Sequence, residues 1–172
     1  MSIFQYLEVK TCAGSFSIKL KIKQAPITCA YFIQLVSNGE LADGKLFRVL
    51  TDKNQKAEPR IKVIQLGSNK KLDELRSYIK HENTSISGLT HKKWCVSVAR
   101  FKPGEVYKSF FICMRDEPTL DYTGNRHPDK QGFACFGEVV RGVEVVKKLY
   151  EMAGNQEMLN PAISIESFDL VN

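Results

Sequence analysis

Apolar and polar residues alternate along the early part of the chain, which is the period of a strand with one wet face. The alternation covers residues 7–9 and resumes at 16–20, with a turn-forming segment at 12–15 between them. Pro26 then starts a stretch in which apolar residues recur at helical spacing as far as residues 38–39, and proline suits the first turn of a helix. The pattern predicts a hairpin followed by a helix that packs on a sheet.

Further strand candidates lie at residues 46–50, 61–65, 94–100, 109–114, 131–139 and 163–170, and a short amphipathic helix candidate lies at 143–150. The polar segment 51–59 predicts a surface loop, whereas 67–93 shows only a weak pattern and predicts a long surface excursion. About eight short strands with two helices favour a closed barrel or a sandwich over a parallel sheet, because closure removes exposed edges. We expect one mostly β domain that spans residues 1–172.

The composition is that of an ordinary globular protein, with 43% hydrophobic and 26% charged residues. No apolar run is long enough to span a membrane, and the first residues lack the basic-then-apolar order of a secretory signal. We therefore expect no membrane association and a cytoplasmic location, or a periplasmic one if the sequence is a processed form. The net charge of +6 comes from scattered basic residues, which predicts no specific nucleic-acid site. We expect a monomer.

Several kinds of reactive site are disfavoured by the sequence. Five cysteines lie far apart and mostly among apolar neighbours, which favours reduced thiols and a reducing compartment. Cys113 and Cys135 lie inside apolar strands, where a thiolate is poorly solvated. His81, His91 and His127 lie in loop-like segments without metal-ligand spacing, so we expect surface histidines and no metal site. The sequence has no glycine-rich phosphate loop and no Gly-x-Ser-x-Gly elbow.

The acidic pair Asp116 and Glu117 flanks a loop, where a solvated role is expected. The remaining candidates are two polar residues in apolar strands. Arg48 lies within one apolar strand and Gln65 ends another, and a buried arginine without partners costs free energy. Strand alternation also allows Arg48 to point outward into solvent, and the spacing alone leaves both orientations open.

Seven short motifs occur in the order and spacing of one known family. They are Ala25-Pro26, Phe47-Arg48-Val49, Val63-Ile64-Gln65, Val98-Ala99-Arg100, Phe110-Phe111-Ile112, Leu120-Asp121 and the run 131–139. Along nearly the whole chain these motifs resemble the cyclophilin-type peptidyl-prolyl cis-trans isomerases. The run 125–133 and the excursion at 67–93 resemble a bacterial branch of that family.

The resemblance implies a closed eight-stranded antiparallel barrel capped by two α-helices, with a packed interior and a substrate groove on its outer face. Arg48 matches the family's catalytic arginine. The other matched positions imply substrate-binding residues, namely Gln65, Val63, Ala99, Arg100, Ser109, Phe111, Leu120 and Phe133. The resemblance implies no metal and no cofactor, and its implied partners are proline-containing peptides and unfolded proteins.

Several groove positions depart from the family pattern. Ser109 stands where Gln or Glu is usual, and Phe47 where His or Tyr is usual. Arg100 replaces an Asn of eukaryotic members, and Thr119 stands where cyclosporin-sensitive members often have Trp. We therefore expect an isomerase with reduced activity and weak cyclosporin binding. Two other functions stay open: a module that binds proline peptides without useful catalysis, and a β-barrel scaffold in a larger complex.

Overall fold

The computed structural model describes residues 4–70 and 76–172, and antiparallel strands dominate this part of the chain. The strands are β1 (Tyr6–Thr11), β2 (Gly14–Leu20), β3 (Lys45–Leu50), β4 (Val63–Gly67), β5 (Ser77–Tyr78), β6 (Cys95–Lys102), β7 (Glu105–Cys113), β8 (Cys135–Arg141) and β9 (Met158–Val171). The helices are α1 (Pro26–Ser37), α2 (Thr84–Ser87) and α3 (Val143–Tyr150), with a 3-10 turn, η2, at Pro118–Leu120. None of the described helices has the length and apolar character needed to cross a membrane.

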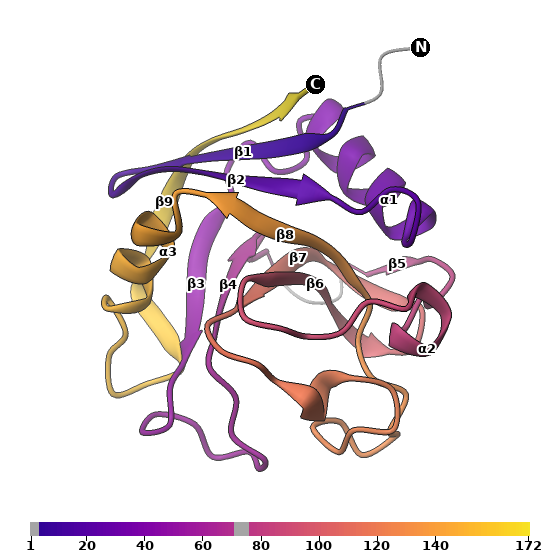
Figure 1. The fold of residues 1–172 in the computed structure, drawn as a ribbon. Helices are drawn as coiled ribbons and strands as arrows, with labels where there is room; N and C mark the ends of the chain where they lie inside the picture. The colour runs from indigo at the N-terminus through magenta and orange to yellow at the C-terminus, as the bar shows by residue number, and fades with distance from the viewer. Residues whose placement is uncertain (1–3, 71–75) are drawn as a thin grey trace.

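Eight of the strands close into a barrel. Neighbours in the order β4-β3-β9-β1-β2-β8-β6-β7 are hydrogen-bonded, and β4 also pairs with β7, which closes the ring. The two-residue β5 adds a ninth strand beside β7, and α2 adds a single helical turn. Figure 1 shows α1 and α3 on different sides of the barrel. The predicted closed antiparallel barrel with two capping helices is confirmed.

The first elements follow the alternation that is visible in the sequence. Leu7 lies opposite Ile18 and Val9 opposite Phe16 across the pair of β1 and β2, and all four side chains are buried. After this hairpin, α1 begins at Pro26. Proline is favourable there because an N–H at the first helical position would have no acceptor within the helix.

The buried apolar residues form two separate clusters. The inner cluster fills the barrel around Phe32, Phe110 and Phe136, with the Phe32 and Phe136 rings stacked at 4.5 Å between centroids. The outer cluster consists of Leu50, Ile61, Val63, Cys95, Ala99, Phe111, Cys113, Leu120 and Cys135. Phe110 and Phe111 belong to different clusters because successive side chains of a strand point to opposite faces. Strand β7 therefore lines both the packed interior and the outer surface.

Two parts of the chain differ from the sequence prediction. Strand β9 starts at Met158, before Pro161, rather than after it. Pro161 is tolerated because the pairing of β3 with β9 changes register nearby, between Ile163 and Met158, so the ladder needs no N–H from the proline. The excursion at 67–93 contains β5 and α2, and residues 71–75 within it lie outside the described part.

The expectation that all five cysteines are reduced is wrong for two of them. Cys95 on β6 and Cys135 on β8 form a disulfide, with their Cα atoms 6.6 Å apart. The two strands are paired in the sheet, but the sequence separation of 40 residues hides that proximity. Cys12, Cys29 and Cys113 are free thiols.

Candidate active site

A hollow of about 180 Å³ opens over the outer cluster. Phe111 and Leu120 are among its lining residues, and Phe133 meets Phe111 edge to face with ring centroids 5.6 Å apart. The backbone N–H of Phe133 donates to the carbonyl oxygen of Leu120 at 2.9 Å, which ties the loop before β8 to η2. The floor formed by Phe111 and Leu120 is apolar and fixed by the fold, and the size suits one small ring.

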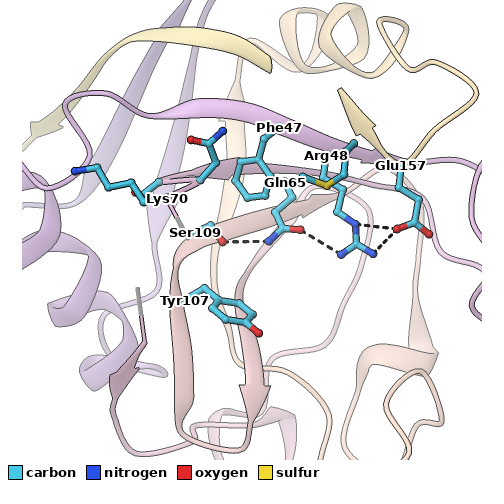
Figure 2. A pocket seen from close by; sticks show the side chains of 10 residues that line it. Phe47, Arg48, Gln65, Lys70, Tyr107, Ser109 and Glu157 are labelled. Atoms are coloured by element: carbon cyan, nitrogen blue, oxygen red, sulfur yellow. Dashed lines mark hydrogen bonds and ion pairs between the residues drawn. The ribbon is translucent and has the colours of Figure 1, made fainter. Parts of the chain in front are cut away.

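Arg48 and Gln65 lie at the border of this hollow on neighbouring strands, opposite each other in the pairing of β3 with β4. Arg48 Nη1 donates to Gln65 Oε1 at 3.4 Å, and Gln65 Nε2 donates to Ser109 Oγ at 3.1 Å (Figure 2). The Arg48 side chain is 32% exposed. Of the two orientations left open above, Arg48 adopts the outward one, but the outer face here is a groove rather than open solvent.

A carboxylate that the sequence did not single out holds Arg48 from its other side. Glu157 Oε2 accepts hydrogen bonds from Arg48 Nη2 at 2.8 Å and from Arg48 Nε at 3.2 Å (Figure 2). Glu157 lies directly before β9 and reaches Arg48 because β9 pairs with β3. Sequence reasoning missed it because the two residues are 109 positions apart and no motif includes Glu157.

A second hollow of about 450 Å³ lies beside the first, and Arg48, Gln65 and Tyr107 line both. Eight of the nine predicted site residues border the smaller hollow: Arg48, Gln65, Val63, Ala99, Arg100, Phe111, Leu120 and Phe133. The ninth, Ser109, borders the larger hollow. The structure therefore brings all nine to one continuous surface. Tyr107, which the sequence did not indicate, lines both hollows.

Arg100 supports the wall of the smaller hollow. Its guanidinium donates to both carboxylate oxygens of Asp129 at 2.9 Å and to the Gly132 carbonyl at 2.8 Å, and its central carbon lies 4.6 Å from the centroid of Phe133. Burial opposes ionisation of Asp129, but hydrogen bonds from Arg100 and the Gln131 N–H outweigh it and lower the pKa of Asp129. These contacts occupy Arg100 and hold Phe133 in place.

One histidine expected at the surface is buried beneath the floor of the hollow. His91 is 1% exposed, with Nδ1 2.7 Å from Asp121 Oδ1 and Nε2 2.9 Å from Ser97 Oγ. Its ring lies nearly parallel to Phe111, with 6.2 Å between centroids. The expectation failed because His91 lies in a polar segment whose residues gave no sign of packing under β6 and β7. This hydrogen-bonded unit fixes the side of Phe111 that faces away from the hollow.

Glu117 is also buried rather than solvated, with 3% exposure. Its Oε1 accepts from the Lys62 backbone N–H at 2.7 Å and from Arg115 Nε at 2.7 Å, so the carboxylate joins two loops. Asp116 stays exposed, as expected. Within residues 4–70 and 76–172, no group of three or more His, Cys, Asp or Glu side chains is placed to hold a metal ion.

A closed eight-stranded barrel with an apolar hollow on its outer face, and an arginine at the border of that hollow, defines a class of peptide-binding barrels. The family model of cyclophilin type peptidyl-prolyl cis-trans isomerases matches residues 6–170. The chain belongs to this family. The family, the fold and the isomerase activity predicted from the sequence motifs are confirmed.

Curated relatives and solved structures are similar over most of their length. A peptidyl-prolyl cis-trans isomerase of Streptomyces antibioticus is 27% identical over 168 residues, covering 94% of this chain and 95% of the relative. Peptidyl-prolyl cis-trans isomerase A of Dickeya dadantii is 28% identical, covering 94% of this chain and 78% of the relative. A cyclophilin of Cryptosporidium parvum has the same fold, with a TM-score of 0.78, 18% identity and 99% of both chains covered.

Proposed function

We propose that the smaller hollow holds the proline ring of a substrate and that Arg48 is the catalytic residue. The observation that carries this proposal is the position of Arg48, whose guanidinium stands at the border of an apolar hollow floored by Phe111 and Leu120. A proline ring in the hollow has its nitrogen near the wall, where a cation with N–H donors can reach it. Val63, Ala99 and Phe133 complete the walls.

The chemistry requires only that amide delocalisation be weakened. The bond before proline resists rotation by about 18–20 kcal/mol because the nitrogen lone pair is shared with the carbonyl group. In the twisted state the lone pair is localised on nitrogen, and only then can it accept a hydrogen bond from Arg48. This interaction stabilises the transition state more than the ground state. A barrier lower by about 6 kcal/mol corresponds to a rate gain on the order of 10⁴.

The flanking chain of the substrate is proposed to lie along β4 and β6. The pairing of β6 with β7 changes register between Val98 and Arg100, on either side of Ala99, and such irregularities free backbone groups from the ladder. Gln65 is oriented by Arg48 and Ser109, which bond to its two amide atoms. Ser109 therefore acts through Gln65, and its short side chain is consistent with a reduced activity.

Proline-containing peptides and unfolded proteins are the proposed partners. A structure of the Cryptosporidium parvum cyclophilin was determined in the presence of the dipeptide Ala-Pro, which supports a site for a single proline. Thr119 still stands where a tryptophan often supports cyclosporin binding, so weak binding of that ligand remains our prediction. We also expect a monomer, in the cytoplasm or, for a processed form, in the periplasm.

Replacing Arg48 with Ala tests the proposal. We expect kcat/KM for an Ala-Pro peptide to fall by roughly 10²-fold or more, because the donor to the twisted nitrogen is lost. Two-dimensional exchange NMR measures the rate, and peptide titration measures binding, which should weaken far less. Arg60→Ala is the matched control, since Arg60 is exposed and pairs with Glu58 outside both hollows. A wild-type rate equal to the uncatalysed one would support a binding module instead.

A further inference from the structure

The residues that line the smaller hollow carry positive charge and no negative charge. Three of them are arginines, Arg48, Arg100 and Arg126. No aspartate or glutamate is among the described residues that line it. A concave, partly apolar site with charge of one sign attracts the opposite charge more strongly than an open surface does.

Two of the three arginines have carboxylate partners that do not line the smaller hollow, although Glu157 lines the larger hollow beside it. Arg48 pairs with Glu157 at 2.8 Å, and Arg100 pairs with Asp129 at 2.9 Å. Arg126 differs, because no carboxylate within the described ranges lies within 4.0 Å of its guanidinium. The hollow therefore retains one arginine without a carboxylate at contact distance, and Glu157, Glu117 and Glu58 attract its charge only from farther away.

One nitrogen of Arg126 is anchored and the other two are not. Nη1 donates to the carbonyl oxygens of Pro59 at 2.8 Å and Ala57 at 3.3 Å, and to Gln55 Oε1 at 3.2 Å. Nε and Nη2, which carry three of the five guanidinium hydrogens, have no acceptor in the described part of the chain. The anchor restricts the side chain, so little rotamer entropy is left to lose when a ligand binds.

The surroundings of Arg126 make its unpaired charge costly. The side chain is partly buried. Burial first, and then repulsion from the nearby Arg48, lower the pKa of Arg126 from its usual value, although an arginine stays protonated at neutral pH. An anion placed between Nε, Nη2 and the hollow would offset both effects and accept charge-assisted hydrogen bonds.

We infer that Arg126 recognises an anionic side chain next to the substrate proline, so that the groove prefers acidic X-Pro or Pro-X sequences. This inference rests on the proposed function of the same hollow. The recognised group is a carboxylate of aspartate or glutamate, or the phosphoryl group of a phosphorylated serine. The three contacts made by Nη1 tie the loop at 121–134 to the loop at 51–62, but they do not use the two nitrogens assigned here to the ligand.

Matched peptides test the inference on the wild-type protein. Two series place Glu, Gln or Lys directly before or directly after proline in an otherwise alanine peptide, with a phosphoserine peptide added to each series. Exchange NMR gives kcat/KM after subtraction of each peptide's own uncatalysed rate. We expect glutamate to exceed its isostere glutamine by roughly tenfold in at least one series, as for a charge-assisted hydrogen bond in a partly buried site. Lysine should be the poorest, and added salt should reduce the preference.

Two substitutions assign the preference to Arg126. Arg126→Gln should bring the glutamate-to-glutamine ratio to within about twofold of one, whereas Arg126→Lys, which keeps the charge, should retain part of it. Arg60→Gln is the control, because it removes the same charge from the neighbouring loop outside the hollow. If Arg126→Gln does not fold, the ratio in the wild type, its salt dependence and Arg126→Lys still decide the question.

The outcomes separate this inference from the proposed function. If the protein turns over the glutamate and glutamine peptides at equal rates, the proposed role of Arg126 is wrong and the isomerase proposal stays intact. A preference that survives Arg126→Gln also overturns that role. No turnover of any peptide contradicts the proposed function, and titration of the same peptides then measures the binding preference by itself. A phosphoserine rate well above the glutamate rate identifies phosphoryl as the better ligand, and the reverse identifies carboxylate.

Discussion

At the scale of single residues, Arg48 is held by a neutral amide on one side and by a charged carboxylate on the other. Gln65 offers one amide oxygen at 3.4 Å, whereas Glu157 offers a carboxylate oxygen to both Nε and Nη2. These contacts leave hydrogens of Nη1 and Nη2 available for a substrate. Glu157 limits the rotamers of Arg48 and aligns its free N–H groups with the hollow. We assign it a positioning role.

Glu157→Gln should lower kcat by roughly three- to fivefold, because a partly exposed ion pair stabilises one geometry by about 1 kcal/mol. KM should change little, since Phe111 and Leu120 bind the ring in both proteins. Exchange NMR at several peptide concentrations separates the two constants. Glu151→Gln, at an exposed position of the same segment, should leave both unchanged. An unaltered kcat in Glu157→Gln would contradict the positioning role.

The motifs predicted site residues on the strands together with Leu120 on η2 and Phe133 in the loop before β8, and they did not predict Glu157 or Arg126. Arg48 and Phe111 lie in runs whose order and spacing are recognisable. Glu157 and Arg126 lie in loops, and they reach the groove only because β9 pairs with β3 and because η2 directs the loop after it. His91 was misjudged for the same reason, since burial in a loop leaves no periodic pattern in the sequence.

At the scale of elements, β4 carries the barrel closure, because it pairs with β3 on one side and β7 on the other. All five of its residues are buried. At its end, Gly67 has φ of +134° and lies opposite Ser109. A Cβ at this position would lie 2.5 Å from the carbonyl oxygen of Lys108, so only glycine allows this approach of β4 to β7.

Gly67→Ala should destabilise the fold by about 2–4 kcal/mol, because both the backbone conformation and the contact with a neighbouring strand are strained. Urea unfolding measures the loss. Gly154→Ala is the matched control, since a Cβ there has no heavy atom within 4 Å, and its effect should stay below about 0.5 kcal/mol. Equal urea midpoints for Gly67→Ala and Gly154→Ala would contradict this expectation. They would show that β7 shifts at little cost to make room for the added Cβ.

Period-two alternation predicted β1 and β2, whereas the later strands were predicted as short apolar runs, because strands such as β4 are buried on both faces. The pattern failed where packing is not periodic. In the excursion at 67–93, α2 is stabilised by Asn83, whose side chain accepts hydrogen bonds from the backbone N–H groups of Ser85 and Ile86. Such a cap is a local contact that hydrophobic spacing does not reveal.

At the scale of the whole molecule, the five cysteines occupy three environments. Cys12 is exposed, Cys29 and Cys113 are buried thiols, and Cys95 is bonded to Cys135. Burial, with a smaller contribution from Glu82, raises the pKa of the Cys29 thiol to about 12. Burial also raises the pKa of Cys113 well above its usual value. The reactivity of each cysteine toward alkylation therefore depends on whether the protein is folded and on whether the disulfide is reduced.

Alkylation with iodoacetamide at pH 8, read by mass spectrometry, should label only Cys12 in the native protein. The thiolate fraction of Cys29 at that pH is about one in ten thousand, because a pKa near 12 lies four units higher. After denaturation without a reductant, three cysteines should be labelled, and all five after reduction. Five labels without a reductant would contradict the Cys95–Cys135 disulfide.

The separation of the inner cluster from the outer cluster has a consequence for how this protein can change. Leu120, Ala99 and Val63 lie outside the aromatic packing of the barrel interior. Substitutions that reshape the hollow therefore need not disturb the contacts that set the topology. We expect libraries that randomise the groove to yield many folded variants with altered sequence preference, which makes this barrel a tolerant scaffold for evolution and for design.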